Sequence, residues 1–139
     1  MRARLLLALA TFSIAASASA QEVRREFHNV GVSIGREGRL AYYASPDENC
    51  GRGIAPQISV VEHPNYGKIT LRPDRLIAYA STVPRHAEHC RGKFVDVTAV
   101  FYKPAKGFHG SDRAVLRVAF PVASGAADTL YDTIYISVR

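Results

Sequence analysis

The sequence is poor in several residue types, and each shortage narrows the class of protein it can encode. Its 139 residues include no tryptophan, one methionine and only two cysteines. The cysteines, Cys50 and Cys90, lack the C-x-x-C spacing of a redox-active dithiol. After residue 20 the chain has no apolar run approaching the roughly 20 residues that a transmembrane helix needs. No membrane-spanning segment is therefore expected in the mature chain.

Concentrated charge is also lacking. Eighteen Lys and Arg residues against 12 Asp and Glu residues give a formal net charge of +6. The basic residues are dispersed along the sequence, and no aromatic residues interleave with a dense basic block, as they would in a nucleic-acid-binding segment. We therefore expect no nucleic-acid partner. A mildly basic surface suits an acidic protein or an anionic envelope polymer, and it also fits an ordinary solvated face.

Helical periodicity is almost absent, and the period-two pattern of β-strands takes its place. Apolar and polar residues alternate in segment after segment, for example at Val30–Ile34, Lys68–Leu71 and Val95–Tyr102. Only a short helical turn near Pro84–His89 is expected. About seven such segments in roughly 100 residues indicate one all-β domain, a β-sandwich spanning residues 21–139.

Turn-forming residues set the expected strand boundaries. Arg72-Pro73-Asp74-Arg75 has the Pro-Asp signature of a tight turn and predicts a break between two strands. Pro104 cannot donate a ladder hydrogen bond, so the strand through Phe101 is expected to end there. Ser124–Asp128 predicts a loop before the last strand.

Catalytic patterns are missing as well. No nucleophile-elbow glycine pattern surrounds any serine, and no obvious carboxylate pair is present. The acidic run Asp47–Glu48 and the single Asp112 offer too few oxygen ligands for calcium, which takes six to eight. The sequence therefore predicts a non-enzymatic protein that needs no cofactor.

The amino end has the three parts of a secretory signal peptide. Arg2 and Arg4 precede an apolar stretch, and Ala18-Ser19-Ala20 forms a small-residue cleavage site. We expect residues 1–20 to be removed and the mature protein, beginning at Gln21, to be periplasmic or secreted. In such an oxidising compartment Cys50 and Cys90 are expected to form one disulfide. Closing a loop of about 40 residues contributes about 4 kcal/mol in the chain-entropy model.

One cluster beside the second cysteine admits another interpretation. His86 and His89, together with Cys90 and Glu88, form a metal-like group. If the thiols were free, the histidines and cysteines would suit zinc or copper. If the disulfide forms, the same residues make an exposed loop with solvated histidines.

A turn rich in special residues lies between two late strands. The segment Phe101–Asp112 reads Y-x-P-x-x-G-F-x-G-x-D, through Tyr102, Pro104, Gly107, Phe108, Gly110 and Asp112. Gly107 and Gly110 allow positive φ at low cost, and Asp112 is expected to accept backbone N–H bonds that hold the turn. We expect the ring of Tyr102 to be buried at the end of the sandwich, with its hydroxyl bonded to the backbone.

Together with Pro64–Ile69, which fits P-x-x-G-x-[IV], this turn resembles bacterial cadherin-like and immunoglobulin-like sandwich repeats. The resemblance covers roughly Ile58–Phe120 and implies a single immunoglobulin-like (cadherin-like) antiparallel β-sandwich. The chain differs from the family in having an inserted segment at 81–94 and in being a single copy. The insertion implies an extra loop tied to the region of Cys50.

These observations lead to three hypotheses about function. The first is a non-catalytic extracytoplasmic binding or structural module that recognises a protein or an envelope polymer. The second is a periplasmic metal-binding or redox-responsive protein that uses the loop of His86, His89 and Cys90. The third is a secreted hydrolase inhibitor that reaches its target with a disulfide-held loop.

Overall fold

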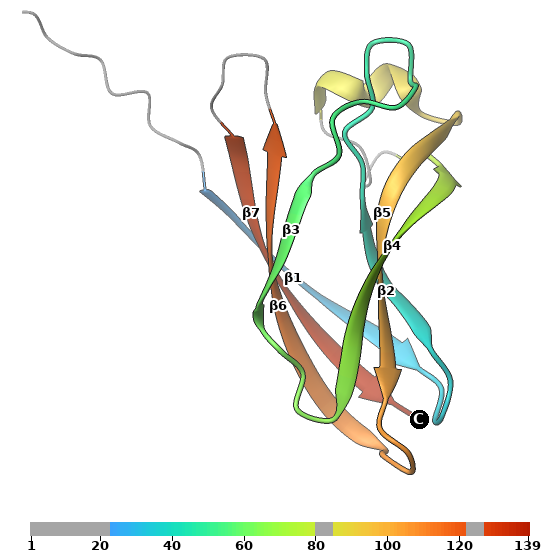
Figure 1. The fold of residues 1–139 in the computed structure, drawn as a ribbon, viewed down its shortest axis with the longest axis vertical. Helices are drawn as coiled ribbons and strands as arrows, with labels where there is room; N and C mark the ends of the chain where they lie inside the picture. Colours follow the sequence, from blue (N-terminus) through green and yellow to red (C-terminus); the bar gives the residue numbers. More distant parts are fainter. Residues whose placement is uncertain (1–22, 80–84, 122–126) are drawn as a thin grey trace, which may run out of the picture.

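The computed structural model describes residues 23–79, 85–121 and 127–139. Seven strands and one short 3₁₀ helix follow one another along these segments (Figure 1). In chain order they are β1 (Val23–Val32), β2 (Gly38–Tyr43), β3 (Gln57–Glu62), β4 (Gly67–Ile77), η1 (Arg85–Cys90), β5 (Phe94–Pro104), β6 (Gly110–Pro121) and β7 (Ala127–Val138). The expected signal peptide, residues 1–20, lies outside the described residues.

The strands form two sheets that pack as a sandwich. One sheet has the order β1-β7-β6-β3 and the other the order β2-β5-β4. The all-β class, the number of strands and the sandwich arrangement are those predicted from the sequence. Every strand pair is antiparallel except β1 and β7, which run parallel over the whole of β1. The first and last strands therefore lie side by side at the edge of the larger sheet (Figure 1).

The main core lies between the two sheets. It contains alternate residues of β6 and β7, which meet Tyr43 of β2 and Tyr102 of β5. The rings of Tyr43 and Phe120 contact each other edge to face, with centroids 6.5 Å apart. The fully buried members of this core include Leu116, Val118, Ile134 and Val100.

A second, smaller apolar cluster lies on the other face of β5. Its members are small: Ala44, Cys50, Ala78, Ala87, Cys90, Val95, Val97 and Ala99. Val95, Val97 and Ala99 alternate along β5 and face away from the main core. The outer face of the β2-β5-β4 sheet is therefore covered, around Val95–Ala99, by the two loops that carry the cysteines.

One predicted turn is wrong. Arg72–Arg75 does not break the chain, because β4 runs without interruption from Gly67 to Ile77. Pro73 pairs with Thr98 in the middle of the ladder. The strand order places β4 at the edge of its sheet, where a residue with no N–H to donate is tolerated. The tight-turn signature therefore marks an edge strand here.

Other boundaries agree with the sequence. β5 ends at Pro104, and η1 supplies the short helical turn that was expected before Cys90. The loop expected at Ser124–Asp128 lies largely outside the described residues. In the part of the chain that the structure describes, no helix is long and apolar enough to cross a bilayer.

Candidate binding site at the loop end

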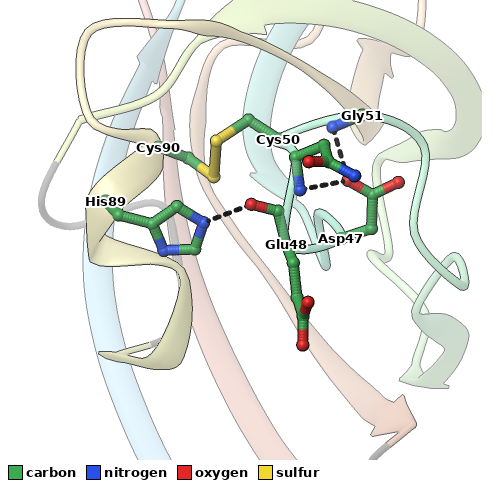
Figure 2. Close-up of a disulfide and its surroundings, with 7 residues drawn as sticks. Asp47, Glu48, Cys50, Gly51, His89 and Cys90 are labelled. Carbon is green, nitrogen blue, oxygen red and sulfur yellow. Dashed lines mark hydrogen bonds between the residues drawn. A yellow bond between two sulfur atoms is a disulfide. The ribbon is translucent and has the colours of Figure 1, made fainter.

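One end of the sandwich carries residues 44–56, which connect β2 to β3, and the described residues 78–79 and 85–93, which lie between β4 and β5. Both lie at the top of Figure 1, and together we call them the loop end. The Cys50–Cys90 disulfide joins them, with a Cα–Cα distance of 5.4 Å (Figure 2). The predicted disulfide is therefore present, and it links residues 40 positions apart in sequence.

Asp47 shapes the first loop around Cys50. Its Oδ1 accepts the backbone N–H groups of Asn49 (2.9 Å) and Gly51 (2.8 Å) (Figure 2). Its carbonyl oxygen accepts the N–H of Cys50 at 3.0 Å. Cys50 then takes a φ of 63°, an uncommon value for a residue with a side chain. Asp47, which the sequence offered as a calcium ligand, therefore supplies the hydrogen-bond acceptor of a tight turn.

The rest of this loop, residues 51–56, is fixed against the backbone that precedes it. A Cβ at Gly53 would lie 1.9 Å from the carbonyl oxygen of Ser45, so only glycine allows this close approach. Pro56 is buried just before β3. Between these two anchors Ile54 projects into solvent with 73% of its surface exposed.

Backbone hydrogen bonds also organise the second loop. Ala78 donates to the carbonyl of Lys93 and accepts the N–H of Gly92, both at 2.8 Å. Its side chain is fully buried, as are those of Ala87 and Cys90. The described parts of the loop end are therefore built on a small core of their own.

The metal-like cluster is brought together only in part. Ligand atoms of Cys50, His89 and Cys90 lie within 4.8 Å of one another. The two sulfur atoms are joined in the disulfide and are not thiolates, the form that binds metals. The Nε2 of His89 contacts the carbonyl oxygen of Glu48 at 2.9 Å (Figure 2). His86 lies in η1, and its side chain is outside the described part of the structure.

Large apolar side chains are exposed around these loops. Ile77 and Phe94 pair directly across β4 and β5, with exposed fractions of 36% and 58%. Tyr79, two residues after Ile77, is 61% exposed. The guanidinium of Arg75 lies 6.0 Å from the Phe94 ring. Exposed apolar groups that gather in one region of a surface commonly mark a contact site.

A cleft of about 410 Å³ lies beneath the segment that carries Ile54. Both loop and strand residues line it: Ser45, Arg52, Gly53, Ala55, Pro56, Pro73, Asp74, Asp96, Val97 and Thr98. At its edge the Nε of Arg52 bonds the Oδ2 of Asp96 at 3.2 Å. The loop end therefore combines a concave region, an ion pair and projecting apolar side chains.

The opposite end of the sandwich, which we call the turn end, holds the turn residues singled out in the sequence. The buried hydroxyl of Tyr102 donates to Oδ2 of Asp112 at 2.8 Å, and not to a backbone group as expected. Asp112 also accepts the N–H groups of Asn65 and Tyr66, each at 2.9 Å, from the loop between β3 and β4. Burial is the main cause that raises the pKa of the Tyr102 hydroxyl, and the hydrogen bond to Asp112 is the second cause.

The remaining turn residues support the same connection. Gly107 and Gly110 have φ values of 76° and 128°. The ring of Phe108 stacks on that of Tyr66, with centroids 4.5 Å apart. Pro104 is buried at the end of β5. This set of residues ties the two connections of the turn end to each other.

Sequence reasoning missed one buried polar group that joins the sheets. Asp132 of β7 is 2% exposed; it accepts the hydroxyl of Tyr43 from β2 and lies 3.1 Å from the Nδ1 of His28 on β1. The hydrogen bond to Asp132 is the main cause that raises the pKa of His28 above its usual value. One signal was available: Asp132 occupies the inward register shared by Leu130 and Ile134.

This group has no catalytic geometry in the described part of the molecule. The carboxylate of Asp132 lies beside the ring of His28, the same two residue types that are paired in the triad of many hydrolases. The other hydrogen bond of the His28 ring is to the backbone of Leu40, where a triad would have a hydroxyl or thiol. Burial raises the pKa of the Tyr43 hydroxyl, which therefore stays protonated. The three residues join strands instead.

Comparison with known proteins gave few matches. No family model matches the chain, and no curated protein matches it. Among solved structures, that of PbICP-C in complex with falcipain-2 matches with a TM-score of 0.37 and 16% sequence identity. The match covers 86% of this chain and 93% of the other. At this TM-score the likeness establishes neither family nor function, so function is inferred from the chain's own residues.

Proposed function

We propose that this protein is a non-catalytic, extracytoplasmic binding module that recognises a protein through its loop end. The observation that supports this proposal is that loops cross-linked by a disulfide lie beside exposed apolar side chains. Ile54 lies on the first loop and is 73% exposed; Phe94, the first residue of β5 directly after the second loop, is 58% exposed. The two loops have their own buried cluster. A surface that is ordered before binding loses less conformational entropy when it meets its partner.

The two ends of the sandwich differ in a way that supports this assignment. At the turn end, the carboxylate of Asp112 accepts hydrogen bonds from the Tyr102 hydroxyl and from the backbone N–H of Tyr66. At the loop end the disulfide joins the two loops to each other. Ile54, Tyr79 and Phe94 are 73%, 61% and 58% exposed there, against 51% for Tyr66 at the turn end. Binding residues are found more often on loops held by a rigid scaffold than on the scaffold itself.

A second candidate is narrower: the partner is a hydrolase, and the protein inhibits it. The observation in favour is the segment Arg52–Pro56, which lacks regular secondary structure and is anchored at both ends. It presents one side chain, Ile54, in the manner of a peptide substrate. A segment pre-ordered in this way can fill a hydrolase cleft at low entropic cost.

Capture experiments with matched variants test the binding proposal. The exported protein, Ile54→Asp and Phe94→Asp are used as baits on the producing cell's envelope and medium. Val61→Asp is the control, because Val61 is 52% exposed but lies on β3, outside the loops. The proposal expects one protein to be captured by wild type and Val61→Asp, and to be lost with both loop-end variants. Equal capture by all four baits would contradict it.

The inhibitor candidate needs a separate measurement. Activity-based probes for serine and cysteine hydrolases are applied to the same fractions, with and without the protein. A fall in the labelling of one hydrolase, absent with Ile54→Asp, supports inhibition. If labelling is unchanged while a protein is still captured, the binding-module proposal is supported and the inhibitor candidate is rejected.

A further inference from the structure

The outer face of the β2-β5-β4 sheet gathers basic residues that are far apart in the sequence. Register places Lys68 of β4 directly opposite Lys103 of β5, and Arg39 of β2 opposite Phe101. Arg72 lies on the same face, with its guanidinium 3.8 Å from the centroid of the Phe101 ring. We call Arg39, Lys68, Arg72 and Lys103 the basic face. The three strands that carry it lie side by side (Figure 1).

The arginines and lysines of this face have different partners. Arg39 pairs with Asp74 at 3.7 Å, and Arg72 pairs with Glu37. Among the described residues, neither Lys68 nor Lys103 has an acidic partner within ion-pair distance. The two lysines therefore add unneutralised positive charge to the basic face.

Two like charges directly opposite each other across a ladder are destabilising. Lys68 and Lys103 are both exposed, and Lys106 follows closely in the turn after β5. Residues that lower the stability of the fold are expected at positions where a binding surface requires them. An anionic ligand would remove the repulsion, so the arrangement fits a negatively charged partner.

The aromatic residues on this face narrow the chemistry of that partner. Phe101 is half-buried beneath Arg72, and Tyr42 lies beneath Arg39 at 5.5 Å. Single-stranded nucleic acid needs open rings on which its bases stack. A membrane-surface site needs apolar side chains that enter the lipid beside the charges. The described residues of the basic face offer neither an open ring nor a large exposed aliphatic group.

We propose that the basic face binds an anionic glycan, a polysaccharide carrying carboxylate, sulfate or phosphate groups. The guanidinium groups of Arg39 and Arg72 lie over the rings of Tyr42 and Phe101, and their planar forks have N–H donors beyond those that face Asp74 and Glu37. Lys68 and Lys103 supply the free positive charge. Lys68 and Lys103 lie at the start of β4 and the end of β5, whereas Arg39 pairs with Asp74, which also lines the loop-end cleft. The basic face therefore extends from the edge of that cleft toward the opposite end of the sandwich.

Binding of the full exported protein to polygalacturonate, with neutral dextran as a reference, tests the proposal. We expect binding to polygalacturonate only, weakening as NaCl is raised. The double variant Lys68→Gln/Lys103→Gln should bind about 25-fold more weakly, from about fivefold per lysine near an anionic surface. Arg25→Gln/Arg117→Gln removes the same charge from the other sheet, where both residues lie opposite Tyr131, and should bind within about twofold of wild type.

Three results would overturn the proposal. Equal weakening of both double variants would mean that net charge alone is responsible. Binding to vesicles of anionic phospholipid, or to a DNA oligonucleotide, without binding to polygalacturonate would assign the face to another partner. Absence of binding to all these probes at low salt would leave the face an ordinary solvated surface. Thermal melting of each variant verifies that it is folded.

Discussion

Tyr102 and Asp112, ten residues apart and on successive strands, are joined by a buried hydrogen bond of 2.8 Å. The same carboxylate accepts three backbone N–H groups, from Asn65, Tyr66 and Arg113. One side chain therefore holds the loop between β3 and β4 against the turn between β5 and β6. This relationship makes Asp112 a stability residue, located at the end of the molecule away from the proposed protein-binding loops.

Replacing Asp112 with alanine should lower the free energy of unfolding by about 2–3 kcal/mol, because it leaves buried donors without an acceptor. Tyr102→Phe removes only one of the four donors and should cost about 1 kcal/mol. Urea denaturation of both variants measures the difference. An Asp112→Ala protein as stable as wild type would show that the carboxylate does not hold the turn.

Gly67 should tolerate no side chain. A Cβ at this position would lie 2.2 Å from the Tyr102 ring, whereas one at Gly31 would meet the end of the flexible Arg139 side chain at 3.6 Å. Gly67→Ala is expected to cost about 3 kcal/mol or more through overpacking. Gly31→Ala is the matched control and should cost less than about 1 kcal/mol. Similar melting temperatures for the two variants would contradict this packing.

The disulfide should contribute a large part of the stability. Replacing Cys50 and Cys90 together with alanine should lower the free energy of unfolding by about 2–5 kcal/mol. The loop-end hydrogen bonds of Asp47 and Ala78 do not involve the sulfur atoms, so the variant should fold at low temperature. Calorimetry tests this, and an unchanged melting temperature would show that the disulfide does not stabilise the fold.

His28 should make stability depend on pH. Its pKa is raised in the folded protein, chiefly by the hydrogen bond to Asp132. A raised pKa means that the contribution is fully present below the unfolded value of about 6.5 and is lost as pH rises through the folded value. The stability advantage of wild type over His28→Asn should therefore be larger at pH 6 than at pH 9.

The control for this comparison is Asn29→Ser, which changes the exposed neighbour of His28 on β1, a side chain that does not titrate. Its difference from wild type should stay nearly constant over the same pH range. A His28→Asn difference that is independent of pH, or that grows as pH rises, would show that the imidazolium does not stabilise the contact with Asp132.

The sequence predicted the features that depend on local pattern. Period-two alternation predicted the strands and Pro104 predicted the end of β5. The two cysteines, in a chain expected to be exported, predicted the disulfide. The role of Pro73 was misinterpreted because proline occurs both in tight turns and in edge strands, and the local sequence is similar in the two cases. Only the position of β4 in its sheet tells them apart.

Features that depend on register could not be predicted in the same way. Lys68 and Lys103 are ordinary exposed residues until pairing places them opposite each other. Tyr43 and Asp132 are 89 residues apart and meet only because the two sheets pack together. Local sequence carries no information about such long-range pairings, so the basic face and the buried polar group emerged only from the three-dimensional structure.

The central claim is that the loop end is the protein-binding surface. Site-directed photocrosslinking in the producing cell tests it most directly, with the photoreactive residue placed at Ile54, at Phe94 or at Val61 of β3. The account predicts one shared protein adduct from positions 54 and 94, and none of that mass from position 61. An adduct formed at position 61, with none at 54 or 94, would place the binding surface elsewhere on the sandwich.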